Sequence, residues 1–423
     1  MGLLLPFDDA ERVLNTRLKP HLNSIHVRIK KDNEVTTRNV DILNNLLEHF
    51  CKQMKLNDPL FKLLFKRFVY TGSYYDGLRT KCADEFDINL VLVLPLHKGE
   101  FTYTVFTLPK AYAASRYHHH HLDLFSSTSC QCARANRCFH QNRFVPDRVK
   151  RWLQSVVART LLTYVPSESC AAVAKIRPKE SGPATTFLID LIDGSQIDVD
   201  LVPVIEFRYP DWPDGIKKAG WMTKISAEHC NWFLIPKQPK AYPHLWRLHF
   251  PNMEKKLIED YGCIKPIIRL LKTLRDAYKW NLSSYSLKTF VMNELVANDD
   301  RDYWDQDNQG MLFVRVLGRL GLALKQPGLG IPFLFHPEVD VTEKVKRETR
   351  DNIGNAIERI VRKLRESPDK CIELILKDKP GTKVPSNSAV EEIPSNDVWE
   401  AEFIPDEARP AQNSGSAWRC TIM

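Results

Sequence analysis

The sequence of 423 residues lacks any long apolar run. No stretch reaches the ~18 apolar residues of a membrane-spanning helix, so we expect no such helix. The first residues lack the charged and apolar segments of a secretory signal peptide, and Pro6 stands where a myristoylation signal has serine or threonine. These absences predict a cytoplasmic or nuclear protein, whose ten cysteines would be reduced thiols.

Acidic residues are fewer than basic residues outside the C-terminal tail. The whole chain carries a net charge of +8, whereas residues 384–423 carry −5, so the remainder carries +13. Such a basic body suits a polyanionic partner, although abundant surface lysines on any soluble protein would give the same excess. The tail is rich in proline, serine, asparagine and glutamate, a composition typical of disordered segments.

Hydrophobic periodicity predicts an α+β protein with two lobes. Residues 40–68 repeat apolar positions at helical spacing, so we expect a long N-terminal spine helix that buttresses a mixed β-sheet. Neighbouring strands are expected at 87–96, 185–192 and 196–207, and helices from 253 to about 376, including 264–278 and 352–364. The predicted domains are a sheet lobe at 1–250, a C-terminal helical lobe at 251–383 and a tail at 384–423.

A stretch rich in histidine and cysteine, about residues 111–143, fits neither pattern. It contains four consecutive histidines and then a Cys-x-Cys-x5-Cys-x-His spacing that could ligate zinc. The spacing matches no closed zinc site, so we favour a low-complexity loop inserted between elements. The residues concerned are His118, His119, His120, His121, Cys130, Cys132, Cys138 and His140.

The strongest local signal is a Gly-Ser pair followed about a dozen residues later by two acids. Gly72 would let the backbone approach a phosphate closely, and Ser73 would offer an N–H and a hydroxyl to its oxygens. Glu85 and Asp87 are two residues apart, so on a strand they project from one face. Two such carboxylates repel each other unless a cation lies between them, and the hard magnesium ion is the expected one. On their own, these residues are equally consistent with a turn and two charges at a strand edge.

A third carboxylate would complete a site for two metal ions. Asp200 is the candidate because it lies between apolar residues of an otherwise buried strand, and Asp198 is its rival on the same face. Two ions about 3.5–4 Å apart polarise an attacking ribose hydroxyl and neutralise a departing pyrophosphate. A carboxylate would accept the proton of the hydroxyl. The pattern therefore favours nucleotidyl transfer.

At these residues the sequence resembles the cyclic GMP–AMP synthase-like receptors, a family of animal nucleotidyltransferases with a bilobal fold. The active-site segment of that family is similar to residues 71–75 and 84–87, and its third-carboxylate strand is similar to residues 199–206. Further similar segments follow the family's order at 182–184, 232–237, 246–250 and 283–289, and together they span roughly residues 68–376. Several linked motifs in the right order are more specific than any single one.

The resemblance implies a role for each matching residue. The three carboxylates would hold two magnesium ions, with manganese as an alternative, and the Gly-Ser pair would grip the triphosphate. Lys272 and Ser284 would meet phosphate charge. Tyr285 would stack on a nucleobase, and Arg247 would contact a base edge through its planar fork of donors. Without the other motifs, these lysine, arginine and tyrosine residues would be surface charges and a half-buried core aromatic.

One departure from the family concerns its zinc-binding loop. The vertebrate DNA sensor carries clustered histidine and cysteine just before the helix with the Lys272 equivalent, whereas residues 255–265 contain one cysteine here. We therefore expect no structural zinc at this loop, and double-stranded RNA rather than DNA as the activator, as in insect members. A-form RNA is recognised through its shape, phosphates and 2′-hydroxyls, so a basic groove would suffice. The candidate contacts are Lys52, Lys55, Lys62, Lys66, Arg67, Lys217, Lys218 and Lys224.

The last four residues, Cys420 to Met423, match a prenylation pattern in which terminal methionine favours farnesyl. One lipid chain gives only marginal, reversible membrane contact, and the acidic tail adds no attraction to anionic lipid. Because Thr421 is not aliphatic, a chance match is the alternative.

The resemblance implies a synthase that joins ATP and GTP into cyclic GMP–AMP when it senses double-stranded RNA. By the same resemblance it would act as a dimer on its ligand, and a STING-type receptor would bind the product. A catalytically inactive scaffold of this fold is one alternative, which the intact carboxylates argue against. A polymerase similar to the oligoadenylate synthetases is the other, although segments 246–247 and 283–289 differ from that group.

Overall fold

A computed structural model describes residues 6–29, 33–80, 84–93, 101–105, 121–126, 138–140, 143–165, 170–179, 185–213, 216, 218–237 and 244–377. Residues up to 380 form one compact unit. None of the helices within the described ranges is long and apolar enough to cross a membrane. The candidate prenylation site Cys420, the candidate RNA contact Lys217 and most of the histidine- and cysteine-rich stretch lie outside these ranges.

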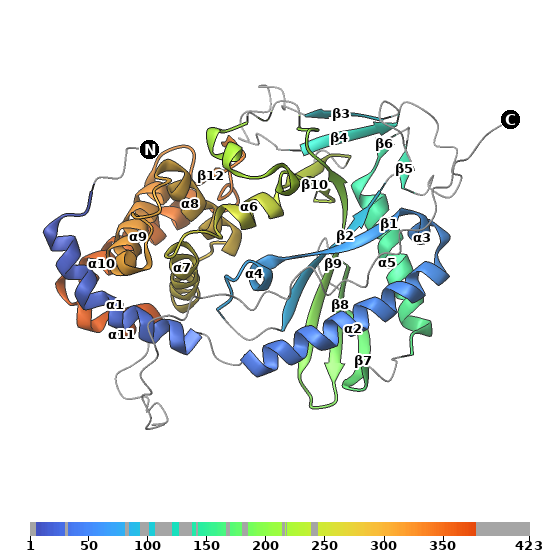
Figure 1. Ribbon diagram of the computed structural model, residues 1–423, viewed down its shortest axis with the longest axis horizontal. Coiled ribbons are helices and arrows are strands. Elements are labelled where there is room, and N and C mark those ends of the chain that lie inside the picture. Colours follow the sequence, from blue (N-terminus) through green and yellow to red (C-terminus); the bar gives the residue numbers. More distant parts are fainter. Residues whose placement is uncertain are drawn as a thin grey trace. The chain divides into compact units, whose positions relative to one another are not determined.

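A mixed sheet forms the centre of the first half of the chain (Figure 1). The main path runs β1-β2-β9-β10-β11-β4-β6-β5, with β8 and then β7 joined to β9 and with β3 joined to β4. The pair β2–β9 is parallel, whereas β8–β9 and β9–β10 are antiparallel. The strands are β1 (Phe65–Thr71), β2 (Glu85–Leu92), β3 (Phe101–Val105), β4 (His121–Ser126), β5 (Phe139–His140), β6 (Arg143–Phe144), β7 (Val173–Lys179), β8 (Thr185–Leu191), β9 (Gln196–Phe207), β10 (Trp232–Ile235) and β11 (Trp246–His249).

Two helices, α2 (Asn33–Asn57) and α5 (Pro146–Thr163), pack against each other beside β8 and β9. The helical spacing predicted from the sequence is confirmed here, because the α2 side chains Leu43, Leu46, Leu47, Phe50 and Met54 are all buried. The Phe50 ring lies 5.5 Å from the ring of Phe187 on β8. Burial of this apolar stripe, rather than helix propensity, holds the helix on the sheet.

The predicted end of this helix at residue 68 was wrong. Asp58 stops α2, because its carboxylate accepts a hydrogen bond from the Phe61 N–H (2.8 Å) and Pro59 begins a new helix, α3 (Pro59–Leu64). Proline is favoured in the first turn of a helix and disfavoured within one. The chain then enters β1, so Lys66 and Arg67 lie on a strand rather than on the spine helix.

The second half of the chain is helical, as predicted. Helix α7 begins and ends where the sequence pattern placed it, and the predicted helix at 352–364 lies within α10. The elements are α6 (Pro251–Leu257), α7 (Ile264–Tyr278), α8 (Ser284–Ala297), α9 (Gln309–Lys325), α10 (Arg347–Glu366), α11 (Cys371–Leu376), the small hairpin β12 (Pro332–Phe333) with β13 (His336–Asp340), and the short helices η4 (Gly220–Lys224), η5 (Ala227–His229), η6 (Gln306–Asn308) and η7 (Pro368–Lys370).

The first helix, α1 (Asp9–Ile29), was not predicted and packs against the helical half through α9 and α11 (Figure 1). Its side chains Leu18, Leu22 and Ile25 are fully buried there. The predicted boundary at residue 250 stays a prediction, because α1 from the first half of the chain packs on α9 and α11 from the second half within the unit of residues 1–380.

Part of the expected insertion at 111–143 belongs to the sheet. Residues 121–126 form β4, which pairs with β11, placing Leu122 opposite Trp246. Cys138 is buried, whereas Cys130 and Cys132 lie outside the described residues. The expectation of a loop was therefore wrong for β4, and the zinc hypothesis stays a prediction.

Candidate active site

Four carboxylates gather where β2 runs beside β9. In this parallel pair Glu85 lies opposite Asp198, and Asp87 lies opposite Asp200. Because side chains alternate along a strand, residues two apart share one face, and directly paired residues share it across the two strands. The sheet thus brings the three predicted metal-binding carboxylates, and the rival Asp198, to one place.

Asp87 is a buried carboxylate with like charges around it. Burial raises its pKa to about 6, and the neighbouring carboxylates of Asp200, Glu85 and Asp76 act in the same direction. An ionised carboxylate is disfavoured both by lost hydration and by nearby like charge. A cation at this position would relieve both effects.

The side-chain partners of the third carboxylate favour Asp200 over Asp198. Asp200 accepts a hydrogen bond from the hydroxyl of Thr186 on β8, which adds no charge. Asp198 forms an ion pair with Lys179, whose Nζ lies 2.7 Å from Oδ2. A carboxylate already neutralised by a lysine has less to gain from a metal ion, so Asp200 remains the better candidate.

These residues fit a magnesium ion by their chemistry. Within the described ranges, no three histidine, cysteine, aspartate or glutamate side chains stand close enough to hold an ion by themselves. Magnesium, however, is usually bound by one or two carboxylates together with substrate phosphates and water rather than by a cage of protein ligands. An oxygen-only, mutually repelling set made of Glu85, Asp87 and Asp200 is the donor set that such an ion needs.

Gly72 begins the short helix α4 (Gly72–Tyr75), which follows β1 directly. Its φ angle is +86°, a region that other residues rarely adopt. A Cβ atom at this position would lie 2.3 Å from Oδ2 of Asp87. The glycine is therefore required for two reasons, and its backbone stands directly against a catalytic candidate.

Helix α7 holds the turn that follows Gly72. Lys272 donates to the Ser73 hydroxyl (3.0 Å) and to the Leu78 carbonyl (2.7 Å). Arg269 donates to the Gly77 carbonyl (2.9 Å). Burial lowers the pKa of Lys272 to about 8, and the nearby Arg275 adds to this effect. The two predicted phosphate contacts, Ser73 and Lys272, are thus hydrogen-bonded to each other.

The start of helix α8 is fixed from two sides. Ser283 caps it by accepting from the Ser286 N–H (2.9 Å), and Arg275 donates to the hydroxyl of the predicted phosphate contact Ser284 (2.9 Å). The Ser286 hydroxyl also donates to the Val341 carbonyl (3.3 Å).

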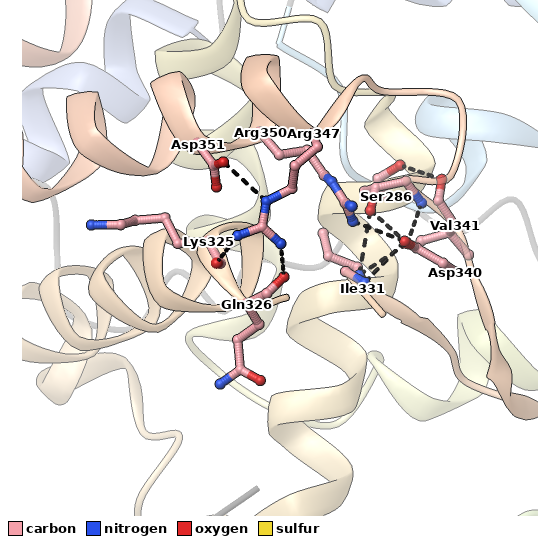
Figure 2. A network of polar contacts seen from close by, with 11 residues as sticks. Ser286, Lys325, Gln326, Ile331, Asp340, Val341, Arg347, Arg350 and Asp351 are labelled. Carbon is pink, nitrogen blue, oxygen red and sulfur yellow. Dashed lines mark hydrogen bonds and ion pairs between the residues drawn. The ribbon is translucent and has the colours of Figure 1, made fainter. Parts of the chain in front are cut away.

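The segment that supports Ser286 is itself immobilised (Figure 2). Asp340 accepts from the backbone N–H of Gly330 (2.9 Å), Ile331 (3.1 Å) and Thr342 (2.7 Å). Arg350 on α10 pairs with the same carboxylate at 3.0 Å. The beginning of α8 therefore rests on a rigid framework, which suits a position that must seat a nucleotide.

Tyr285 and Arg247 lie against each other as the predicted nucleobase contacts. The Arg247 guanidinium is 5.8 Å from the centre of the Tyr285 ring. Tyr285 is half-buried, and its hydroxyl donates to Oε1 of Glu254 (2.8 Å). The ring is held by its hydroxyl while part of its surface stays accessible to a base.

The sequence missed a buried ion triad beside this ring. The Lys288 ammonium lies 2.7 Å from Asp76 and 3.0 Å from Glu254. Burial alone would lower the pKa of Lys288, but the two carboxylates raise it above its ordinary value. Lys288 stands within the family-like segment 283–289 and Asp76 directly follows the segment 71–75, whereas no local pattern marks Glu254.

The predicted nucleic-acid contacts differ in how exposed they are. Lys62 on α3 and Lys66 on β1 are exposed. Lys52 is exposed on α2 and pairs with Glu48 one turn away (2.7 Å). Lys55 lies 5.0 Å from the centre of the Phe65 ring. These four lysines lie on α2, α3 and β1 and stay predicted RNA contacts, although the Lys66 ammonium also lies 3.9 Å from Oε2 of Glu206.

Three other predicted contacts also have partners within the protein, although Lys218 and Lys224 are exposed. Arg67 forms two hydrogen bonds with Glu206, of 2.8 and 2.5 Å. Lys218 lies 5.0 Å from the Tyr209 ring centre, and Lys224 pairs with Asp299. An RNA phosphate would have to compete with these partners.

A glycine turn after β1, an acidic pair on β2 and a third carboxylate on the adjoining strand define a nucleotidyltransferase. Residues 74–260 match the Mab-21 protein nucleotidyltransferase domain, and residues 263–359 match the Mab-21 protein HhH/H2TH-like domain. The chain belongs to the Mab-21 nucleotidyltransferase family, and over most of its length it is similar to cyclic GMP–AMP synthase-like receptors.

The relatives cover most of the chain. A cyclic GMP-AMP synthase-like receptor of Tribolium castaneum is 28% identical over 95% of this chain and 99% of its own length. The receptor of that name from Aethina tumida is 26% identical over 84% of this chain and 89% of its own length. Cyclic GMP-AMP synthase-like receptor 1 of Drosophila melanogaster is 24% identical over 78% of this chain and 86% of its own length. The family resemblance drawn from the motifs is thereby confirmed.

Proposed function

We propose that this nucleotidyltransferase joins ATP and GTP into cyclic GMP–AMP when double-stranded RNA binds to it, and so serves as an innate immune sensor. One observation carries the proposal. Asp87 lies against Gly72 and near three other carboxylates. Its pKa is raised to about 6, mainly by burial and further by these like charges. A fold gains nothing from such repulsion unless cations and phosphates complete the site. The relatives are cyclic GMP-AMP synthase-like receptors by name, which supports the product.

The reaction would consist of two similar transfers. In each, a ribose hydroxyl oxygen of one nucleotide bonds to the α-phosphorus of the other, the α–β phosphoanhydride bond breaks, and pyrophosphate leaves. The hydroxyl proton would pass to one of the carboxylates of the site. Magnesium, or manganese, held by Glu85, Asp87 and Asp200 would supply the positive charge that the attacking oxygen and the phosphates require.

The chain's own residues would seat the two nucleotides. Ser73 directly follows Gly72, the residue that lies against Asp87, and the Ser73 hydroxyl is 3.0 Å from the Lys272 ammonium. Their mutual hydrogen bond would be shared with the phosphate oxygens of a bound triphosphate. Ser284 stands at the start of α8, where backbone N–H groups and the helix dipole favour anions. Tyr285 and Arg247 would hold a base between a ring face and a planar fork of donors.

Activation by double-stranded RNA is supported by the basic face and by the short segment before α7. Residues 258–264 lead from α6 into α7 with Cys263 buried and donating to the Asp305 carbonyl (2.7 Å). Lys52, Lys62 and Lys66 are exposed candidates for phosphate contacts. We further propose a cytoplasmic location, a dimer on the RNA, farnesylation of Cys420 and a STING-type receptor for the product, all of which follow from the sequence pattern and the family.

One assay tests the proposal. Purified protein is incubated with ATP, GTP and magnesium, alone or with long double-stranded RNA or DNA, and the products are separated by chromatography. We expect a cyclic dinucleotide in the presence of RNA, and none from the variant Glu85→Ala/Asp87→Ala. Linear oligoadenylate would indicate a polymerase, and no product under any condition would leave only a binding protein.

A further inference from the structure

A continuous chain of polar contacts joins the predicted base contact to the glycine turn. Tyr285 donates to Oε1 of Glu254 at 2.8 Å. The second oxygen of Glu254 lies 3.0 Å from the Lys288 ammonium, which also donates to Asp76 at 2.7 Å. These residues come from α6, α8 and the end of α4, segments that are far apart in the sequence. We call Tyr285, Glu254, Lys288 and Asp76 the polar relay.

The centre of the polar relay cannot relax into solvent. Glu254 is 1% exposed and Lys288 is 7% exposed. A buried cation shared by two carboxylates is held in place by both, because neither charge can be left unpaired without a large penalty. A displacement of Asp76 must therefore be followed by Lys288, or else leave a buried charge without its partner.

The far end of the polar relay reaches the catalytic candidates. The Asp76 N–H donates to the Gly72 carbonyl (3.1 Å), and Gly72 stands so close to Asp87 that a Cβ would lie 2.3 Å from its Oδ2. Asp76 thus fixes the C-terminal end of the short turn whose first residue touches Asp87. The opposite end of the polar relay is the hydroxyl of Tyr285, the ring on which a base would stack.

We propose that Lys288 is a positioning residue that couples the seating of a nucleobase on Tyr285 to the placement of the Gly72–Gly77 turn against Asp87. The inference rests on the proposed function in that Tyr285 must bind a base. A base that fixes the Tyr285 ring also fixes Glu254, Lys288 and Asp76, so the turn is ordered at the same time. Reciprocally, a turn held by other means raises the affinity for the base, because such coupling is symmetric for binding.

A double-mutant cycle on the two ends of the polar relay tests the coupling. Tyr285→Phe removes only the hydroxyl and keeps the ring, and Asp76→Asn removes only the charge. The affinities of magnesium with α,β-methylene-ATP and of magnesium with GTP are measured for the single and double variants, together with kcat and KM. Because the two residues are not in contact, independent effects would multiply. We expect instead that the loss of nucleotide affinity in the double variant is at least about fivefold smaller than the product of the two single losses.

Two further variants separate coupling from simple destabilisation. Lys288→Arg should restore most of the affinity that Lys288→Met loses. Glu294→Gln breaks another buried ion pair of the same helix α8, with Arg319, away from the polar relay. It should lower the melting temperature without changing either nucleotide affinity.

Three outcomes would overturn the inference. In the first, the effects of Tyr285→Phe and Asp76→Asn on affinity simply multiply in the double variant. In the second, Glu294→Gln loses as much nucleotide affinity as Lys288→Met. In the third, Lys288→Met folds and retains full coupling. The binding measurement needs no turnover, so a chain that makes no cyclic dinucleotide but shows the coupling would refute the proposed product alone.

Discussion

Two acidic side chains on neighbouring strands have opposite environments. On β2, burial and three other carboxylates raise the pKa of Asp87 to about 6. On β9, burial alone would raise the pKa of Glu206, but hydrogen bonds from Arg67 and Asn231 and the charge of Arg208 lower it to about 2. Glu206 is a carboxylate whose partners are all supplied by the protein. Asp87 is one whose partners must come from outside, which is the difference between a stabilising ion pair and a site.

The first prediction removes the charge from the unpaired member. Asp87→Asn should lower product formation more than about 100-fold, because it removes a proton acceptor and a metal ligand. The melting temperature should stay the same or rise, since like-charge repulsion is relieved. The product is quantified by chromatography. Asp198→Asn is the matched control, because Asp198 is already paired with Lys179, and a similar loss in both variants would contradict the assignment.

The second prediction separates backbone strain from contact with Asp87. Gly72→Ala and Gly194→Ala both place alanine at a positive φ, of +86° and +83°, but only the first has a neighbour within 4 Å of the new Cβ. Both should lose about 1–2 kcal/mol of unfolding free energy from the backbone alone. Only Gly72→Ala should lose most activity, as measured by initial rates. Full activity in Gly72→Ala would show that the contact with Asp87 has no catalytic consequence.

The third prediction changes the paired member. Glu206→Gln should cost about 1–3 kcal/mol of unfolding free energy at pH ~7, because Arg67 and Arg208 lose their charged acceptor. Because the pKa of Glu206 is lowered in the folded protein, its ionised form stabilises the fold at pH values above the ordinary glutamate pKa. This contribution is lost as the pH falls through about 2. Urea unfolding of the two proteins should therefore converge as the pH is lowered from ~5. Initial rates should change little.

The fourth and smallest effect concerns the pH dependence of Asp87. A raised pKa favours the fold at low pH, and this contribution is lost as the pH rises through about 6. Without magnesium, the melting temperature should fall by a few degrees between pH ~4 and ~7 relative to Asp87→Asn. Magnesium should reduce the difference. A melting temperature independent of pH in this range would mean that Asp87 is not strained.

The sequence predicted the parts of the fold that repeat a local pattern. Strand β9 and helix α7 begin and end where alternation and helical spacing placed them. It missed α1, where Pro20 interrupts the apolar pattern, and it ran the spine helix through the Asp58–Pro59 stop. It missed β4, whose short Leu-Asp-Leu-Phe alternation stands directly after the run of four histidines.

The candidate site shows the same division. Gly72, Glu85 and Asp87 could be found because they lie close together in the sequence and belong to one motif. The contact of Gly72 with Asp87, and the triad of Lys288 with Asp76 and Glu254, depend on segments up to 212 residues apart. Arg67 was predicted to face RNA because nothing near it in the sequence reveals Glu206 on β9.

The packing of α1 has a practical consequence for fragments of this protein. Asn15 accepts from the N–H of Gly310 (2.7 Å) and Met311 (3.2 Å), and so caps α9 from the other end of the chain. A recombinant fragment that starts at residue 74, where the family match begins, would leave the start of α9 uncapped and would expose its apolar flank to solvent. The limits of the family match are therefore poor guides for truncation, because helix α1 packs on the helical half with Leu18, Leu22 and Ile25 fully buried.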